Sequence, residues 1–295
     1  MSTTIAGKPV SAIGLGCGTF GREIDEAASF AFMDRARERG VTLFDTAAAY
    51  GAGASERIVG AWLESRRPTT VILATKLLPP YEPAKLPDQL EQSLQRLGVT
   101  AVDLLYLHQW HPSAVNPETL AVLDGFVRSG KVRTLGASNF LASQLAVALS
   151  HQKAAGLARF EVVQNNHNFA VSELVPAFCE VCDANSIAVV TYSPLGAGFL
   201  TGKHRGGVQA GSRFDIVPAH QKIYFQPEAW RRFERLEAVA ARHGYHPAHL
   251  ALAWALHRRP VASVLIGGRT PAHLEQAFAA WELNDPEIFS ELETT

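Results

Sequence analysis

Short apolar runs that end on a polar side chain recur along the chain. Residues 41–44 lead into Asp45, residues 71–75 into Lys76, and residues 104–107 into His108. A run of this length is typical of a buried strand whose polar group emerges at its carboxyl end. In a parallel sheet these ends share one edge, so the pattern predicts that the three side chains lie together. Tyr50, in the loop after Asp45, would join them.

Eight apolar runs alternate with stretches of helical spacing. The predicted strands are residues 12–15, 41–44, 71–76, 104–108, 132–137, 159–164, 187–192 and 261–266. The predicted helices are residues 25–40, 54–64, 87–98, 116–130, 141–154, 172–184, 227–243, 247–258 and 271–281, with a last short helix within 283–295. Strand-plus-helix units repeating at roughly 30 residues predict an α/β fold, a (β/α)8 TIM barrel. It would carry a short N-terminal extension, extra helices and a long loop after the seventh strand.

That long loop is predicted at residues 193–226. It is irregular and too long for a simple connector, which makes it a candidate lid. The chain has no low-complexity segment or linker, so residues 1–295 are predicted to form a single barrel domain.

The composition and charge of the chain argue against several classes of partner and location. Hydrophobic residues make up 47% of the chain and the formal net charge is -1, which argues against nucleic acid or an anionic membrane as a partner. No apolar run approaches the roughly 18 residues of a membrane span, and the first residues do not read as a secretory signal. The 3 cysteines do not form a disulfide framework. We expect a soluble, reduced, cytoplasmic protein. The sequence does not indicate the oligomeric state.

The four polar residues form a set suited to proton transfer. The ordinary pKa of a tyrosine is about 10, and a neighbouring ammonium lowers it. Lys76 would supply that ammonium, Asp45 would hold the lysine, and His108 would orient a carbonyl substrate. Tyr50 would protonate the carbonyl oxygen, while a nicotinamide or flavin would deliver the hydride. Taken singly, an Asp–Lys pair is often only an ion pair, and a lone histidine is usually a structural polar residue.

Several ordered motifs resemble the aldo-keto reductase family over nearly the whole chain, closest to its bacterial and fungal aryl-alcohol-dehydrogenase-like branch. The matching stretches are residues 14–21, 44–51, 74–76, 103–108, 129–133, 136–140, 192–195 and 200–203. The resemblance implies an NADP(H)-dependent oxidoreductase that reversibly reduces aldehydes or ketones to alcohols without a metal, with NADPH preferred over NADH. The substrate would be a small carbonyl compound or alcohol. Tyr50 would be the general acid and Lys76 its pKa partner. Asp45 would support the lysine, and His108 would orient the substrate.

The resemblance also implies cofactor contacts. Ser138, Asn139 and Gln164 would bind the nicotinamide carboxamide, and Tyr192 would stack on the ring. The pyrophosphate and ribose would lie along Ser193, Leu195, Lys203 and Arg213, and the 2′-phosphate would reach Gly267 and Arg269. Further contacts are expected from Gly18, Thr19, Phe20, Asp45, Gly198, His273 and Gln276. His273, Gln276 and Ala277 differ from the Gln, Glu and Asn usual in the family. Substrate-pocket walls are expected from Phe20, Tyr50, His108 and Trp110, with Phe199 as a further aromatic candidate.

Other interpretations remain open. A cofactor-sensing regulatory module with little turnover, like the potassium-channel β subunits of the same fold, is the alternative function. Residues 16–21 also match a G-x-G-x-x-G dinucleotide-binding pattern, which is weak alone. The C-x-x-C of Cys179 and Cys182 lies in a helical pattern and favours core packing. His243, His246 and His249 favour capping or surface roles over a metal site.

Overall fold

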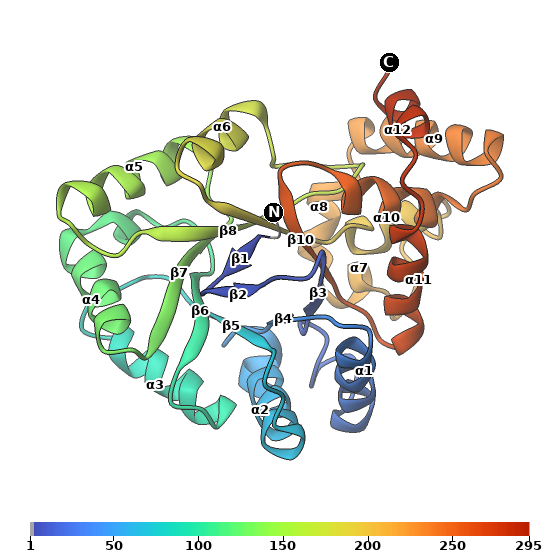
Figure 1. The fold of residues 1–295 in the computed structure, drawn as a ribbon. Coiled ribbons are helices and arrows are strands. Elements are labelled where there is room, and N and C mark those ends of the chain that lie inside the picture. Colours follow the sequence, from blue (N-terminus) through green and yellow to red (C-terminus); the bar gives the residue numbers. More distant parts are fainter. Residues whose placement is uncertain (1–2, 295) are drawn as a thin grey trace.

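Eight parallel strands close into a barrel in the computed structural model, which describes residues 3–294 of the chain. Around the barrel the strands follow the order β10-β3-β4-β5-β6-β7-β8-β9. Their bounds are Ile13–Gly16 (β3), Leu43–Asp45 (β4), Ile72–Leu77 (β5), Val102–Leu107 (β6), Val132–Ser138 (β7), Phe160–Asn166 (β8), Ala188–Tyr192 (β9) and Val261–Ile266 (β10). The predicted (β/α)8 barrel is confirmed (Figure 1).

The principal helices surround the barrel in Figure 1 and cover the outer face of the strands. Their bounds are Glu26–Glu38 (α1), Ala54–Arg66 (α2), Leu86–Leu97 (α3), Pro117–Arg128 (α4), Ala142–Ala154 (α5), Pro176–Ala184 (α6), Pro227–Arg242 (α9), Pro247–His257 (α10), Pro271–Trp281 (α11) and Pro286–Glu293 (α12). Many begin on a proline, whose fixed φ suits the first helical turn. The helix predicted at 172–184 begins only at Pro176, because Ser172 pairs with His167 and Glu173 accepts from the Asn166 backbone.

A short hairpin closes the end of the barrel at which the strands begin. Its strands are β1 (Thr4–Ile5) and β2 (Lys8–Pro9), which lie across the barrel centre in Figure 1. Ile5 is buried with side chains that fill the barrel interior, among them Leu43, Leu104 and Leu265. This plug of apolar side chains leaves the opposite end, where the strands finish, for polar groups.

The segment 193–226 is more ordered than the predicted irregular loop. It contains the short helices η3 (Gly196–Thr201), α7 (Arg213–Ile216), η4 (Pro218–His220) and α8 (Gln221–Tyr224). Phe199, Phe214 and Tyr224 are buried in a second apolar cluster with residues of α9 and α10. These aromatic anchors explain why the segment folds, and they correct the expectation of an irregular loop.

Candidate active site

Strand ends bring the four predicted residues together at one rim of the barrel. Asp45 is the last residue of β4, Lys76 lies near the end of β5, and His108 directly follows β6. Tyr50 follows β4 and opens the short helix η1 (Tyr50–Gly53). Because β4 pairs with β5 and β5 with β6, the three strand residues meet without any long excursion of the chain.

Lys76 is buried at the centre of this group. Its ammonium donates hydrogen bonds to the Asp45 carboxylate, to the Thr46 carbonyl oxygen at 2.9 Å and to the Tyr50 hydroxyl at 3.2 Å. The second carboxylate oxygen of Asp45 accepts a hydrogen bond from Gln164 Nε2 at 2.8 Å. The pair is therefore enclosed in a complete polar network.

The charges within this network are set by burial and pairing. Burial raises the pKa of Asp45 more strongly than Lys76 and Gln164 lower it. Burial lowers the pKa of Lys76, but the attraction of Asp45 and Tyr50 outweighs it, and the net shift is upward. Since the ordinary pKa of the lysine lies far above that of the aspartate, the proton stays on Lys76 and the two form an ion pair.

Tyr50 keeps its proton in this environment. Burial raises its pKa above the ordinary value, and the Asp45 carboxylate adds to the shift, while Lys76 lowers it. Lys76 lowers the pKa of Tyr50, as the sequence predicts, but burial outweighs it, with a smaller contribution from Asp45, and the net shift is upward. The hydroxyl is therefore protonated and held against an ammonium.

His108 is neutral. Burial, with a further contribution from Lys76, lowers its pKa to about 3. Its ring lies edge-on to the Tyr50 ring, with centroids 5.8 Å apart and an interplanar angle of 89°. An uncharged imidazole and a protonated phenol at one rim can both hydrogen-bond to a single small polar group.

Residues of the next three strands extend the network. The Tyr192 hydroxyl donates to Asn139 Oδ1 at 2.7 Å, and Asn139 Nδ2 donates to the His108 carbonyl oxygen at 2.8 Å. The Ser138 hydroxyl donates to the Gln164 carbonyl oxygen at 2.9 Å. The residues predicted to bind a carboxamide are therefore gathered beside the Asp45–Lys76 pair.

A turn rich in left-handed backbone follows β9. Ser193, Gly196, Ala197 and Gly198 have φ between 57° and 93°. The Lys203 side chain crosses Gly198 so closely that an added Cβ would lie 3.2 Å from Lys203 Cε. Such turns present backbone N–H groups to anions. Leu195, in the same turn, packs against the apolar core.

The loops after β3 and β10 lie side by side. An added Cβ at Gly267 would sit 3.4 Å from the Gly16 carbonyl oxygen, and the Thr19 hydroxyl donates to the Gly268 carbonyl oxygen at 2.8 Å. An added Cβ at Gly18 would lie 3.8 Å from the Tyr50 ring. The glycine-rich loop of residues 16–21 thus borders Asp45, Tyr50, Lys76 and His108 (the tetrad) within a closed barrel, and not in the doubly wound sheet where a G-x-G-x-x-G dinucleotide-binding pattern usually occurs.

Arg213 and Arg269 share a partner that the sequence did not predict. Both guanidinium groups pair with Glu23, in the loop after β3. Nothing in the spacing of Glu23 distinguishes it from a surface glutamate, so only the fold reveals it. On α11, His273 Nδ1 accepts from the Arg269 backbone N–H at 3.2 Å, and Gln276 is exposed.

The aromatic candidates for a substrate pocket divide into two groups. Trp110 is half-buried and packs edge-on against Phe140, 5.1 Å between centroids. Phe20 and Phe199 have no exposed surface; Phe20 packs against Phe32, and Phe199 lies in the second apolar cluster. Their rings serve packing here, while Tyr50, His108 and Trp110 retain exposed surface.

Two other sequence features have structural roles. Cys182 is buried and Cys179 half-buried on α6, both as free thiols. His246 caps α10 by accepting from the Ala248 backbone N–H at 3.1 Å, and His243 pairs with Glu291. Across residues 3–294 no group of three or more His, Cys, Asp and Glu side chains is placed to hold a metal ion. Within the same residues no helix is both long and apolar enough to cross a membrane.

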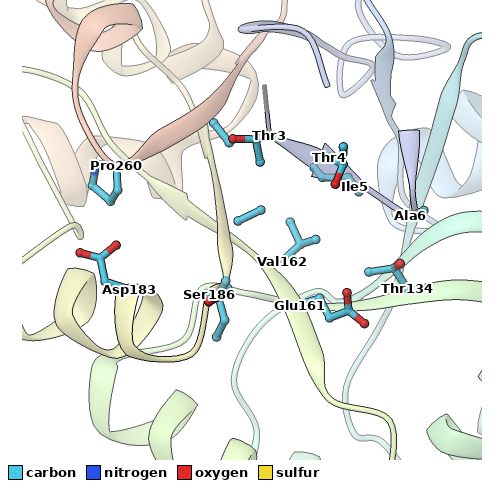
Figure 2. Close-up of a pocket in the computed structure, with 13 residues that line it drawn as sticks. Thr3, Thr4, Ile5, Ala6, Thr134, Glu161, Val162, Asp183, Ser186 and Pro260 are labelled. Carbon is cyan, nitrogen blue, oxygen red and sulfur yellow. The ribbon is translucent and has the colours of Figure 1, made fainter. Parts of the chain in front are cut away.

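A cavity of about 410 Å³ lies at the opposite end of the barrel. Figure 2 shows Thr3 and Thr4 of the hairpin facing Glu161, Asp183 and Ser186 across it. Its walls come from the amino ends of β7 to β10. Barrel enzymes build their active sites at the carboxyl ends, and only that end of this barrel carries the connected network of Asp45, Tyr50, Lys76 and His108.

The chain is similar to proteins of one known family. The model of the aldo/keto reductase family matches residues 12–292. The chain is 32% identical to the uncharacterized oxidoreductase YrpG of Bacillus subtilis, over 96% of this chain and 91% of that protein. It is 29% identical to the aldo-keto reductase yakc of Schizosaccharomyces pombe, whose name carries NADP(+), over 94% of this chain and 85% of the relative.

The fold matches a solved structure as well. A glycerol dehydrogenase of Gluconobacter oxydans superposes with a TM-score of 0.81, covering 99% of this chain and 94% of the other at 24% identity. That likeness concerns the fold, and the bacterial and fungal relatives supply the family. This chain belongs to the aldo/keto reductase family.

Proposed function

We propose that the chain is an NADP(H)-dependent enzyme that reduces small aldehydes or ketones to alcohols, reversibly. The observation that carries this proposal is the protonated hydroxyl of Tyr50, held 3.2 Å from the buried Lys76 ammonium and beside a neutral His108. Membership of the aldo/keto reductase family supports an oxidoreductase that acts on carbonyl groups. The polar residues at the barrel rim support Tyr50 as the proton donor of that reaction.

Tyr50 would hold the transferable proton. A carbonyl oxygen between the Tyr50 and His108 rings would accept a hydrogen bond from each, which fixes its orientation. As the oxygen gains negative charge, Tyr50 gives up its proton, and the resulting phenolate lies against the Lys76 ammonium. The lysine thus stabilises negative charge that develops only as the reaction proceeds. An interaction that strengthens in the transition state in this way accelerates the chemical step. A reduced nicotinamide, when bound, supplies the hydride to the carbonyl carbon.

The donor set of this chain fits a nicotinamide dinucleotide. Amide and hydroxyl groups of Ser138, Asn139 and Gln164 are gathered near the proton donor, where a carboxamide would be read. Lys203 and Arg213, in segment 193–226, and Arg269, after β10, supply three cations, which suits phosphates. The preference for NADPH rests on Arg269 and on the relative whose name carries NADP(+).

The test is Tyr50→Phe, which deletes the proton donor and keeps the ring. We expect carbonyl-dependent NADPH oxidation to fall by about a hundredfold or more, the usual contribution of a general acid, while NADPH binding changes little. Tyr245→Phe, the same chemical change at a tyrosine stacked on His249, serves as the matched control and should behave as wild type. Full turnover by Tyr50→Phe would exclude Tyr50 as the acid.

A further inference from the structure

One buried carboxylate outside the tetrad is surrounded by arginines. Glu23 Oε1 accepts from Arg22 Nη2 at 2.8 Å and from Arg213 Nη1 at 2.5 Å. Arg269 Nε lies 3.4 Å from Glu23 Oε2. The glutamate side chain is 3% exposed, whereas the three arginine side chains are 27–40% exposed. The negative charge is therefore enclosed, and the positive charges reach the surface.

The three arginines come from three separate parts of the chain. Arg22 lies in the loop after β3, Arg213 begins α7, and Arg269 follows β10. Guanidinium groups that converge in this way form a site for an oxyanion, and carboxylate and phosphate are recognised by the same fork of donors. Glu23 therefore fills an anion site from within the chain.

The donors of Arg269 are engaged twice. Besides the Glu23 contact through Nε, Arg269 Nη2 donates to the Gly211 carbonyl oxygen at 2.7 Å. A phosphate that binds this guanidinium must replace at least one of these acceptors. It must also approach the charge of Glu23, which repels it.

We propose that Glu23 competes with the 2′-phosphate of NADPH for Arg269 and thereby sets how strongly the protein discriminates between NADPH and NADH. This inference rests on the proposed function. A site that is competent only part of the time raises the apparent Kd by the inverse of the competent fraction. NADH has no 2′-phosphate, so its affinity does not depend on freeing Arg269. Glu23 therefore weakens NADPH selectively.

A purely structural role for Glu23 predicts the opposite sign. The Glu23–Arg213 pair ties the loop after β3 to segment 193–226. If its main effect were to hold that segment in place, loss of the carboxylate would weaken both dinucleotides together. The ratio of the two dissociation constants separates these roles.

The experiment is a fluorescence titration of Glu23→Gln with NADPH and, separately, with NADH. If Glu23 occupies Arg269 for two-thirds to nine-tenths of the time, the Kd for NADPH falls about three- to tenfold in the variant. The Kd for NADH should stay within about twofold of wild type. Glu275→Gln is the matched control, since it removes a half-buried carboxylate on α11 that pairs with Arg35 at 2.6 Å. It should change neither constant.

Arg269→Ala supplies the second half of a thermodynamic cycle. In that background Glu23→Gln should tighten NADPH much less than it does beside Arg269, because the competed group is gone and only the direct repulsion between Glu23 and the phosphate is relieved. An unchanged or weaker NADPH affinity in Glu23→Gln, or an equally large gain without Arg269, would overturn the inference while leaving the enzyme function intact. Wild-type protein that binds neither dinucleotide would refute the proposed function itself, and the competition with it.

Discussion

Replacing Lys76 with methionine tests the electrostatics of the buried ion pair. The lysine and Asp45 side chains are only 1% and 2% exposed, and the substitution leaves the carboxylate with Gln164 as its remaining side-chain donor. An uncompensated buried charge costs about 3–5 kcal/mol. Asp45 lowers this free-energy cost when it takes up a proton, because the protonated acid carries no charge.

Protonation of Asp45 sets an upper limit on the loss of folding stability in Lys76→Met. The ordinary pKa of Asp45 is 3.8, and each pH unit above it costs about 1.4 kcal/mol to keep the acid protonated. At pH 7 the limit is about 4 kcal/mol, and at pH 5 it is below about 2 kcal/mol. An acid with a raised folded pKa binds its proton more tightly than the unfolded chain does, so stability falls as pH rises. Lys76→Met should therefore be less destabilised at pH 5 than at pH 7.

The assay is urea denaturation of wild type, Lys76→Met and the double variant Asp45→Asn/Lys76→Met at both pH values. Because the double variant carries no buried charge at this site, it should recover at least about 2 kcal/mol at pH 7 relative to the single variant. Neither variant should retain wild-type turnover. A double variant no more stable than Lys76→Met, or equal losses at pH 5 and pH 7, would refute the reasoning.

Two further predictions concern the cofactor and acid stability. Arg269→Ala should raise the Kd for NADPH much more than that for NADH in parallel titrations; an equal effect would detach Arg269 from the 2′-phosphate. Burial lowers the pKa of His167 from 6.5 to about 3, so the unfolded chain takes up the proton first as pH falls. His167 therefore removes about 1.4 kcal/mol of stability per pH unit below about pH 6. His167→Gln should flatten the fall of unfolding free energy between pH 6 and pH 4 by that slope; an unchanged slope would contradict a buried neutral imidazole.

The sequence was most informative where apolar runs alternate with stretches of helical spacing. Asp45, Lys76 and His108 each end an apolar run, and parallel pairing necessarily brings such ends to one edge. Tyr50 needed only a short loop to reach them. The barrel and the meeting of these four residues could therefore be predicted.

Features that depend on long-range packing could not. The aromatic residues of segment 193–226 lack a regular period, yet Phe199 and Tyr224 anchor it by packing with residues of α9 and α10. Phe20 lies in a rim loop but turns into the core beside Phe32. Glu23 meets Arg213 and Arg269 across sequence separations that no local pattern records.

The pKa of Tyr50 shows the same limit. The sequence indicates that the Lys76 ammonium lowers this pKa, but it does not reveal how deeply the phenol is buried. In the structure burial and the Asp45 carboxylate act in the other direction, so the hydroxyl is protonated. The pKa of Tyr50 depends on how deeply the hydroxyl is buried and on which charged groups surround it. Only the folded chain specifies both.

The most direct test is to follow deuterium from NADPH labelled at C4 of the nicotinamide, on the transferred face, into the product. The purified protein would be given a panel of aromatic and medium-chain aldehydes and ketones, and the alcohols analysed by mass spectrometry. We predict one deuterium on the carbinol carbon with wild type and little product with Tyr50→Phe. Tight NADPH binding with no labelled alcohol from any carbonyl would contradict the account and favour a cofactor-sensing module.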